Sequence, residues 1–293
     1  MDQLNHILHG LAYVALGVTL LVLTRGLIGM ISPYSLRDQL TSKDNAAAGL
    51  AFTGYLVGVV IIFLGAAIGP DQVEMADGML HDPTWEEIGM SMLVATGYTL
   101  GGLLCLYVGT IVVDKLVLRS FSVQKELVED RNLGTGAVIF GNTVATALII
   151  AGAVHGEEGG PLSAVVFFLL GQAVLVIWAA FYQMITKFDL HEQIEKDNVA
   201  AGTAYGLSVI AIGIVLLRAC MDDLISWPDH LAKFGYFAVA GFVVLALLRT
   251  LTNRALLPGT TLQMEIERDR NINAAWVEGS VAIGAAAIVF FMM

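Results

Sequence analysis

The chain has 293 residues, of which 57% are hydrophobic and only 14% are charged, and its formal net charge is −11. A soluble domain contains about 45–50% apolar and about 25% charged residues, so this composition excludes a disordered chain and an ordinary cytosolic enzyme. The acidic balance also argues against nucleic acid as a partner. The composition instead predicts a protein whose main partner is the lipid bilayer.

Eight segments of the chain are apolar and long enough to cross a bilayer, for which about 20 residues are needed. In chain order they cover residues 3–24, 46–69, 88–113, 133–156, 164–186, 199–217, 234–248 and 272–293. The seventh is the shortest, because Lys233 and Arg249 leave only 15 uncharged residues between them. We therefore predict an all-α polytopic membrane protein with about eight transmembrane helices.

The basic residues are distributed unevenly between the two sides of the predicted bundle. Thirteen of the 15 Lys and Arg lie in or beside the loops that join odd-numbered to even-numbered segments, whereas only Arg218 and Lys233 lie on the other side. Cytoplasmic loops of membrane proteins are enriched in Lys and Arg. We therefore expect four basic loops in the cytoplasm and both termini on the non-cytoplasmic side.

A short motif recurs at the start of every even-numbered segment: an oppositely charged pair, then Asn, then mostly small residues. It occurs as KDNAAAG at residues 43–49, DRNLGTG at 130–136, KDNVAAG at 196–202 and DRNINAA at 269–275. The four copies predict four two-helix hairpins that enter the bilayer in the same orientation, as parallel repeats. Such hairpins could surround a central path, form two side-by-side bundles or pack as one bundle.

The K-D-N-x-A-A-G starts, the E-x-x-N sequences at residues 129–132 and 195–198, and the four-span halves resemble a known family. It is the YjfL-like bacterial inner-membrane family, domain of unknown function 350. Two tandem copies would cover residues 1–156 and 157–293, each as a four-helix transmembrane repeat domain. The resemblance implies a multi-pass protein of the bacterial inner membrane and no particular reaction. The fourth motif departs from the pattern, because Ala275 replaces Gly.

The repeated motif has two interpretations, and the sequence leaves both open. Asn is a preferred helix N-cap, and acidic residues before a helix favour its positive end. Alternatively, four Asp side chains around one cytoplasmic mouth would concentrate cations. Both interpretations concern the same set of residues, which comprises Asp44, Asn45, Asp130, Asn132, Asp197, Asn198, Asp269 and Asn271.

One carboxylate lies within a predicted span. Glu278 follows Asn271 by seven residues, which places it about 10 Å into the membrane if the helix begins there. A charge at that depth costs about 3 kcal/mol or more, so an intramembrane acid is a candidate for function; a hydrogen-bonded structural acid is the alternative. Its candidate companions along a polar path are Asn142, Gln172 and Gln183.

Glycines spaced four residues apart mark faces on which membrane helices pack closely. Gly97 and Gly101 form one such pair, and Gly202 and Gly206 form another. Close packing is the expected role of both pairs.

The sequence contains no P-loop, no H-E-x-x-H and no G-x-S-x-G. We therefore predict no enzymatic activity, no cofactor and no metal site. The leading hypothesis is a channel or transport path for small ions. The alternative is a structural or membrane-stress scaffold that docks a cytoplasmic partner through loops 119–131 and 187–197, in which apolar residues (Phe121, Val123, Leu127, Leu190 and Ile194) alternate with charges. An intramembrane enzyme is the third hypothesis, and a homo-oligomer stays open.

Overall fold

The computed structural model describes residues 2–68, 73–74, 80–155, 160–222, 224–256 and 259–293. Eight helices in this part of the chain are long and apolar enough to cross a membrane. They are α1 (Asp2–Ile31), α2 (Ala46–Ala67), α3 (Trp85–Val112), α5 (Leu133–His155), α6 (Gly160–Ile185), α8 (Val199–Cys220), α9 (Trp227–Leu251) and α10 (Ile272–Met292). The prediction of an all-α polytopic membrane protein with eight spans is confirmed.

Helix α9 is longer than its predicted span, because both of the flanking bases lie inside the helix. It has 25 residues and contains Lys233 and Arg249. Lys233 forms an ion pair with Asp222, just before the helix begins, and Arg249 forms one with Glu278 on α10. Charged side chains within membrane segments are tolerated where they pair with one another. Counting uncharged residues therefore underestimated this span.

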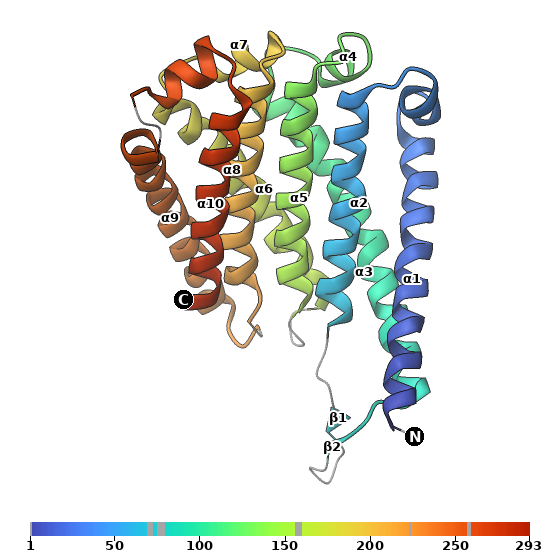
Figure 1. The fold of residues 1–293 in the computed structure, drawn as a ribbon. Coiled ribbons are helices and arrows are strands. Elements are labelled where there is room, and N and C mark those ends of the chain that lie inside the picture. The colour runs from blue at the N-terminus through green and yellow to red at the C-terminus, as the bar shows by residue number, and fades with distance from the viewer. Residues whose placement is uncertain (1, 69–72, 75–79, 156–159, 223, 257–258) are drawn as a thin grey trace.

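The helices that begin at the four Asn residues form a single row. In Figure 1, α2, α5, α8 and α10 lie side by side in chain order, and each packs most extensively against its neighbour in the row. Helices α3 and α6 lie behind the row and α9 lies beside its α10 end, and each of the three packs chiefly against the row helix that precedes it in the chain. Of the arrangements that the motif left open, the structure therefore matches one packed bundle, and the four helix starts do not surround a common axis.

Close backbone contact holds the row together. A side-chain carbon at Gly136 on α5 would lie 2.8 Å from the carbonyl oxygen of Ala47 on α2, and one at Gly141 would overlap the backbone of Gly206 on α8. Small residues are needed where membrane helices approach this closely. Gly97 and Gly101 differ, since space is open beside both of them, so the expectation that this pair packs helices is wrong within a single chain.

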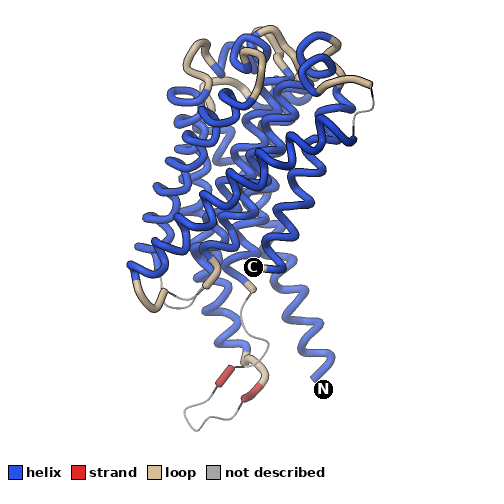
Figure 2. Tube along the Cα trace, turned by 90° about the vertical axis from the view of Figure 1, so that its left-hand side faces the viewer, coloured by secondary structure: helices blue, strands red, loops and turns tan. Residues whose placement is uncertain are grey.

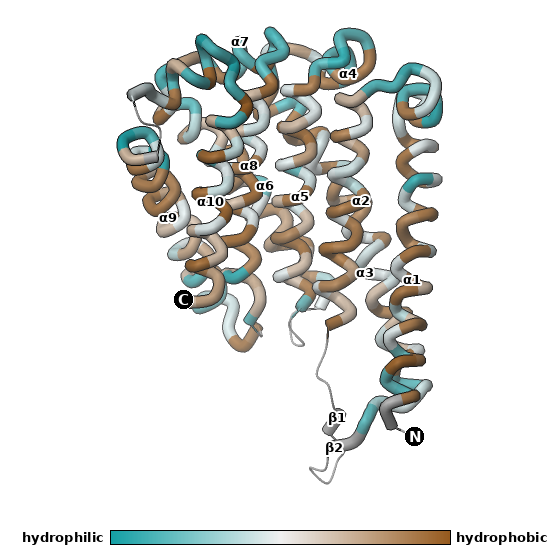
Figure 3. Tube along the Cα trace, viewed as in Figure 1, coloured by the Kyte–Doolittle hydropathy of each residue, from teal (hydrophilic) through white to brown (hydrophobic). Residues whose placement is uncertain are grey.

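Short elements connect the spans. At one end of the bundle they are the helices α4 (Val123–Val128) and α7 (Leu190–Glu195) and the π-helical turns η1 (Asp38–Ser42), η2 (Val113–Val117), η3 (Thr252–Leu256) and η4 (Met264–Arg268). A two-stranded antiparallel hairpin, β1 (Val73–Glu74) and β2 (Leu80–His81), lies at the opposite end, as Figure 2 shows. Figure 3 shows that the end with the short helices is hydrophilic. Its cytoplasmic location, which the charge bias predicts, stays a prediction, and both termini lie at the other end (Figure 1).

Candidate functional site

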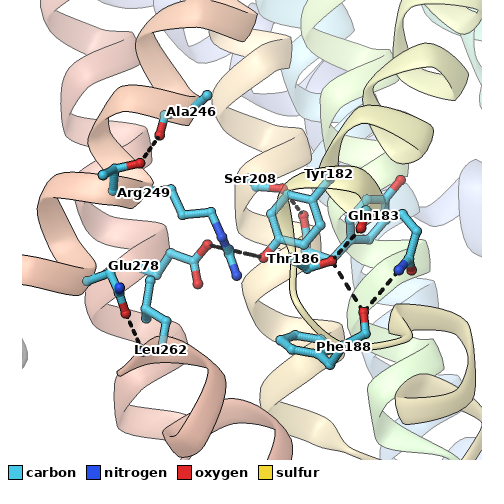
Figure 4. A network of polar contacts seen from close by, with 12 residues as sticks. Tyr182, Gln183, Thr186, Phe188, Ser208, Ala246, Arg249, Leu262 and Glu278 are labelled. Carbon is cyan, nitrogen blue, oxygen red and sulfur yellow. Dashed lines mark hydrogen bonds and ion pairs between the residues drawn. The ribbon is translucent and has the colours of Figure 1, made fainter. Parts of the chain in front are cut away.

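Three helices bring charged and polar side chains together at Glu278. Glu278 comes from the second turn of α10, Arg249 from the last turns of α9 and Tyr182 from α6. Figure 4 shows the three side chains converging between these helices. The Glu278 side chain is only 5% exposed and that of Arg249 12%. The acid found in the sequence is therefore a buried group, with a partner of opposite charge.

The contacts in this cluster are mutual. Arg249 forms an ion pair with Glu278 Oε1, and it also donates a hydrogen bond of 2.8 Å to the Tyr182 hydroxyl. The Tyr182 hydroxyl in turn donates to Glu278 Oε1 over 3.1 Å. The guanidinium carbon lies 4.8 Å from the centre of the Tyr182 ring, within the range of a cation–π contact. Tyr182 therefore holds both charged partners.

Aromatic rings separate this cluster from the rest of the bundle. The Tyr182 and Tyr205 ring centres are 5.4 Å apart, and Trp178, whose ring centre is 6.1 Å from that of Tyr182, donates a hydrogen bond of 3.2 Å to Ser208. Charged pairs interact more strongly where water is excluded. The rings thus shield the Tyr182 side of the Glu278–Arg249 pair.

Two polar atoms beside the ion pair have no hydrogen-bond partner. They are Oε2 of Glu278 and Oγ1 of Thr252, both fully buried. Both residues line a cavity of about 10 Å³, which is the smallest volume that holds one water molecule. Buried polar atoms without a partner are rare and costly in native proteins. The cluster therefore has an unused acceptor next to a space of about one water.

A larger cavity lies on the other side of Arg249, toward the hydrophilic end. Its volume is about 320 Å³, and Arg249 lines both cavities. Lys187 and Arg254 also line it, together with polar residues such as Asn253, and no described residue in the lining is acidic. Basic residues gathered in this way favour an anion. Arg249 is thus shared between Glu278 and a basic cavity.

The companions that the sequence suggested for Glu278 lie elsewhere. Gln183 donates to the carbonyl of Phe188 over 3.0 Å and accepts from the amide of Leu190 over 2.8 Å, so it fixes the turn after α6. Gln172 donates to Thr146 over 3.0 Å, and Asn142 is buried on α5. The structure does not bring these three residues to the cluster, and their part in a polar path stays a prediction.

The four Asn residues of the repeated motif cap the row helices. Asn45 accepts from the amide of Ala48, Asn132 from Thr135, Asn198 from Ala201 and Asn271 from Asn273. The residue before each Asn has a positive φ of 48–53°, in the left-handed region that side chains other than Gly adopt at a cost. Those residues are Asp44, Arg131, Asp197 and Arg270. The N-cap interpretation thus describes the geometry of all four.

Three of these Asn residues also bridge neighbouring repeats. Asn45 donates to the carbonyl of Leu127 over 2.7 Å, Asn132 to that of Ile194 over 2.6 Å and Asn198 to that of Ile266 over 2.7 Å. Each acceptor lies in the short helical segment before the next row helix. The sequence indicated the caps but not the bridges, because a bridge depends on which helices are neighbours.

Each Asn also donates to a side chain of its own repeat. The acceptors are Gln39 and Gln193 in the first and third repeats and Glu126 and Glu265 in the second and fourth. Burial raises the pKa of Glu126, and the hydrogen bond from Asn132 opposes this rise. Glu126 thus carries a desolvation cost that a Gln at the same place avoids.

The acidic residues of the motif do not form a ring. Asp130 pairs with Lys125 over 3.0 Å, Asp269 pairs with Arg268 over 2.7 Å, and Asp197 accepts from the amide of Gly134 over 3.3 Å. Asp44 is exposed. Since the row is linear, these carboxylates are spread along it, and the arrangement gives no support to a cation-concentrating mouth.

The loops proposed for docking turn their apolar residues inward. Val123, Leu127, Leu190 and Ile194 are all buried, and Phe121 is partly buried against the same core. These side chains therefore pack into the core, and exposed polar and charged residues between them are left for a partner.

Comparison with known proteins agrees with this architecture. The sequence model of the family described as Domain of Unknown Function (DUF350) matches residues 2–154 and again 158–293. The chain belongs to the DUF350 family. This DUF350 protein is also 22% identical over 260 residues to a UPF0719 transmembrane protein of Aquifex aeolicus (strain VF5), across 87% of this chain and 88% of the relative. No solved structure matches it. It is a multi-pass membrane protein.

Proposed function

We propose that this DUF350 protein provides a transport path for a small ion across the bacterial inner membrane, with the Glu278–Arg249 pair as the group that responds to the ion. The observation that carries the proposal is the position of Arg249, which forms an ion pair with a buried carboxylate and also lines a basic cavity of about 320 Å³. The division of the chain into domains 1–156 and 157–293 belongs to the same proposal, with the pair in the second domain.

The lining of the larger cavity supports an anion as the transported ion. Lys187, Arg249 and Arg254 supply three positive charges there. An anion in the cavity competes with Glu278 for Arg249. A carboxylate that loses its partner within the membrane is costly to keep charged, at about 3 kcal/mol or more. Glu278 would then take up a proton, so that movement of the anion is coupled to movement of a proton.

Tyr182 allows Arg249 either to stay bonded to Glu278 or to turn away from it. Its hydroxyl accepts from Arg249 and donates to Glu278, and a hydroxyl can rotate to serve as donor or acceptor. When Arg249 turns toward the larger cavity, Tyr182 keeps a hydrogen bond to Glu278. The unpartnered Oε2 of Glu278 is the atom that is free to receive a proton or a water molecule.

The test is flux into liposomes that contain the purified protein and a pH-sensitive dye. Chloride, inorganic phosphate, potassium and sodium are supplied outside in turn, and anion and proton movement are recorded together. We expect Glu278→Gln to uncouple proton movement and Arg249→Gln to abolish anion flux. Glu192→Gln, which changes an exposed carboxylate on α7, is the matched control and should behave as the wild type.

Two results would overturn the proposal. If correctly folded wild-type protein carries none of the four ions, the transport function is wrong. If flux is present and both Glu278→Gln and Arg249→Gln leave it unchanged, the path does not use this pair. Folding of each variant is checked by its far-ultraviolet circular dichroism and its elution from gel filtration.

A further inference from the structure

The row of helices leaves an exposed face at each of its two ends, although α1 also packs against α2 and α9 against α10. Helix α10 has one face against α8, and its opposite face is exposed at Asn273, Trp276, Ser280 and Gly284. Nothing lies within 4 Å of the position that a side chain at Gly284 would occupy. At the other end, α2 packs against α5, and its far face is exposed at Thr53 and Val60.

Within the row, one rule describes how each helix meets the next. Positions are counted from the capping Asn. The residue at position 9 meets position 8 of the next helix, as Gly54 meets Phe140, Gly141 meets Gly206 and Leu207 meets Gly279. The same contact therefore occurs at all three internal interfaces, which fixes their common register.

Two further contacts follow the same register. Position 2 meets position 4 of the next helix, as Ala47 meets Gly136 and Gly134 meets Gly202. Position 13 meets position 15, as Gly58 meets Ala147 and Ala145 meets Gly213. The interface is therefore a repeated structure rather than one particular pairing of side chains.

Helix α10 exposes the positions that each row helix presents to the next one, and α2 carries the positions that receive them. On α10, positions 2, 9 and 13 are Asn273, Ser280 and Gly284, all exposed, and on α2, positions 4, 8 and 15 are Gly49, Thr53 and Val60. If α2 of a second copy followed α10, the rule would pair Asn273 with Gly49, Ser280 with Thr53 and Gly284 with Val60. Each predicted pair contains a Gly or two small polar residues, as close helix packing requires.

The hydrogen bonds that bridge neighbouring repeats also point to a second copy of this chain as the partner of α10. Three of the four capping Asn residues donate to a backbone carbonyl of the next repeat. The fourth, Asn271, donates only to Glu265 of its own repeat among the described residues. The carbonyl that would follow in the series is that of Leu40, the counterpart of Leu127, at the far end of another copy.

The exposed Trp276 of α10 is a bulky residue on one surface, and the other surface has a groove. Trp276 stands where α5 has Ala137, so its ring needs room on the partner. The edge of α2 provides a groove of about 520 Å³, lined by Phe52, Leu56 and Val60 and by Val18 and Val22 of α1. Buried Trp side chains in such pockets are common centres of binding energy.

We propose that copies of this chain assemble head to tail in the membrane, with α10 of one copy packed against α2 of the next in the register of the internal repeats. The interface joins two different surfaces, so association continues either into a closed ring or into a longer array. Four repeats in one chain then become part of an extended row. This inference does not depend on the proposed transport function.

Cysteine cross-linking in native membranes tests the register. The double variant Gly284→Cys/Val60→Cys places the two thiols at the position where Gly213 meets Ala145, which suits a disulfide. We expect oxidation to give a ladder of dimers, trimers and larger species. Single variants at each position report any background from Cys105 and Cys220, and Gly284→Cys/Val239→Cys, with an exposed residue on α9, is the mismatched control.

Two outcomes would overturn the proposal. Covalent dimers from Gly284→Cys in a chain whose Cys105 and Cys220 are replaced by Ser would mean that two α10 helices face each other. An absence of products from the double variant would mean that these surfaces do not meet. A second measurement covers poor folding of a cysteine variant. Gly284→Leu should shift the mass in mild detergent, measured by light scattering, from oligomer to monomer, whereas Val239→Leu should leave it unchanged.

Discussion

The bridging role of the Asn residues predicts a large difference between two chemically identical substitutions, Asn132→Ala and Asn271→Ala. Asn132 is fully buried, caps α5 over 2.8 Å and donates both to Ile194 of the next repeat and to Glu126. Asn271 caps α10 and donates to Glu265, and it is partly exposed. The two variants therefore remove the same cap, but only Asn132→Ala removes a bridge.

The expected magnitudes follow from these contacts. Loss of an N-cap costs about 1 kcal/mol. Each buried acceptor that is left without a donor costs a further ~1–3 kcal/mol. Asn132→Ala leaves the carboxylate of Glu126 in this state, whereas the carbonyl of Ile194 keeps its hydrogen bond from the amide of Asp197. We therefore expect a loss of about 2–4 kcal/mol in the free energy of unfolding for Asn132→Ala and about 1 kcal/mol for Asn271→Ala.

The assay is denaturant unfolding in a detergent that keeps the protein monomeric, followed by circular dichroism. Asn132→Ser separates the two contributions, because Ser caps a helix as well as Asn does but is too short to bridge. Its loss should be close to that of Asn132→Ala minus the cap. If Asn132→Ala costs no more than Asn271→Ala, or if Asn132→Ser is as stable as the wild type, the bridge contributes no stability and the reasoning is wrong.

Three further predictions concern other parts of the bundle. Burial raises the pKa of Glu126, so the wild type loses stability as the pH rises from about 4.5 through that raised pKa. Glu126→Gln should therefore be more stable than the wild type at pH 8 and equally stable at pH 4. Paired denaturant titrations measure the difference, and a difference that grows toward acid pH would contradict the prediction. Gly141→Ala should destabilise the protein by about 1–3 kcal/mol through overpacking, while Gly97→Ala, with open space beside it, should be neutral or stabilising; equal thermal shifts would count against the close helix contact. Arg249→Met should lower the free energy of unfolding by about 3–5 kcal/mol, because it leaves a buried carboxylate unpaired. The double variant Arg249→Met/Glu278→Met should recover most of that loss. A double variant as unstable as the single one would refute the pairing.

The sequence predicted the spans and gave the caps as one of two interpretations of the motif, because spans and caps both depend on local chemistry. About 20 apolar residues are needed wherever a chain crosses a bilayer, and Asn caps a helix whatever lies around it. The linear row was not predictable in the same way. The spans are apolar on nearly every side, and lipid is as apolar as Leu. The pattern of residues therefore does not distinguish a helix face that contacts another helix from one that contacts lipid. Gly97 and Gly206 illustrate the point, since only Gly206 has a helix against it.

The partner of Glu278 was missed for a related reason. Arg249 lies near the end of a span, where a basic residue indicates orientation, so the sequence places it on the cytoplasmic side. A signal was nevertheless present, since Arg249 left its span with only 15 uncharged residues, fewer than a crossing requires. A membrane helix that includes Arg249 needs an acid on a neighbouring helix, and Glu278 is the acid within a neighbouring span. The length deficit and the acid together would have pointed to the pair.

The residues that occupy the position of Glu278 in the other three repeats show whether the fold requires a carboxylate there. Counted from the capping Asn, position 7 is Phe52 in the first row helix, Ile139 in the second and Tyr205 in the third. All three are buried, so the same helix packing forms with apolar or aromatic side chains at this place. A buried ion pair is often no more stable than well-packed apolar residues of similar volume. The fold therefore does not require the carboxylate, and its position beside Arg249 and a basic cavity is what the proposed transport function would use.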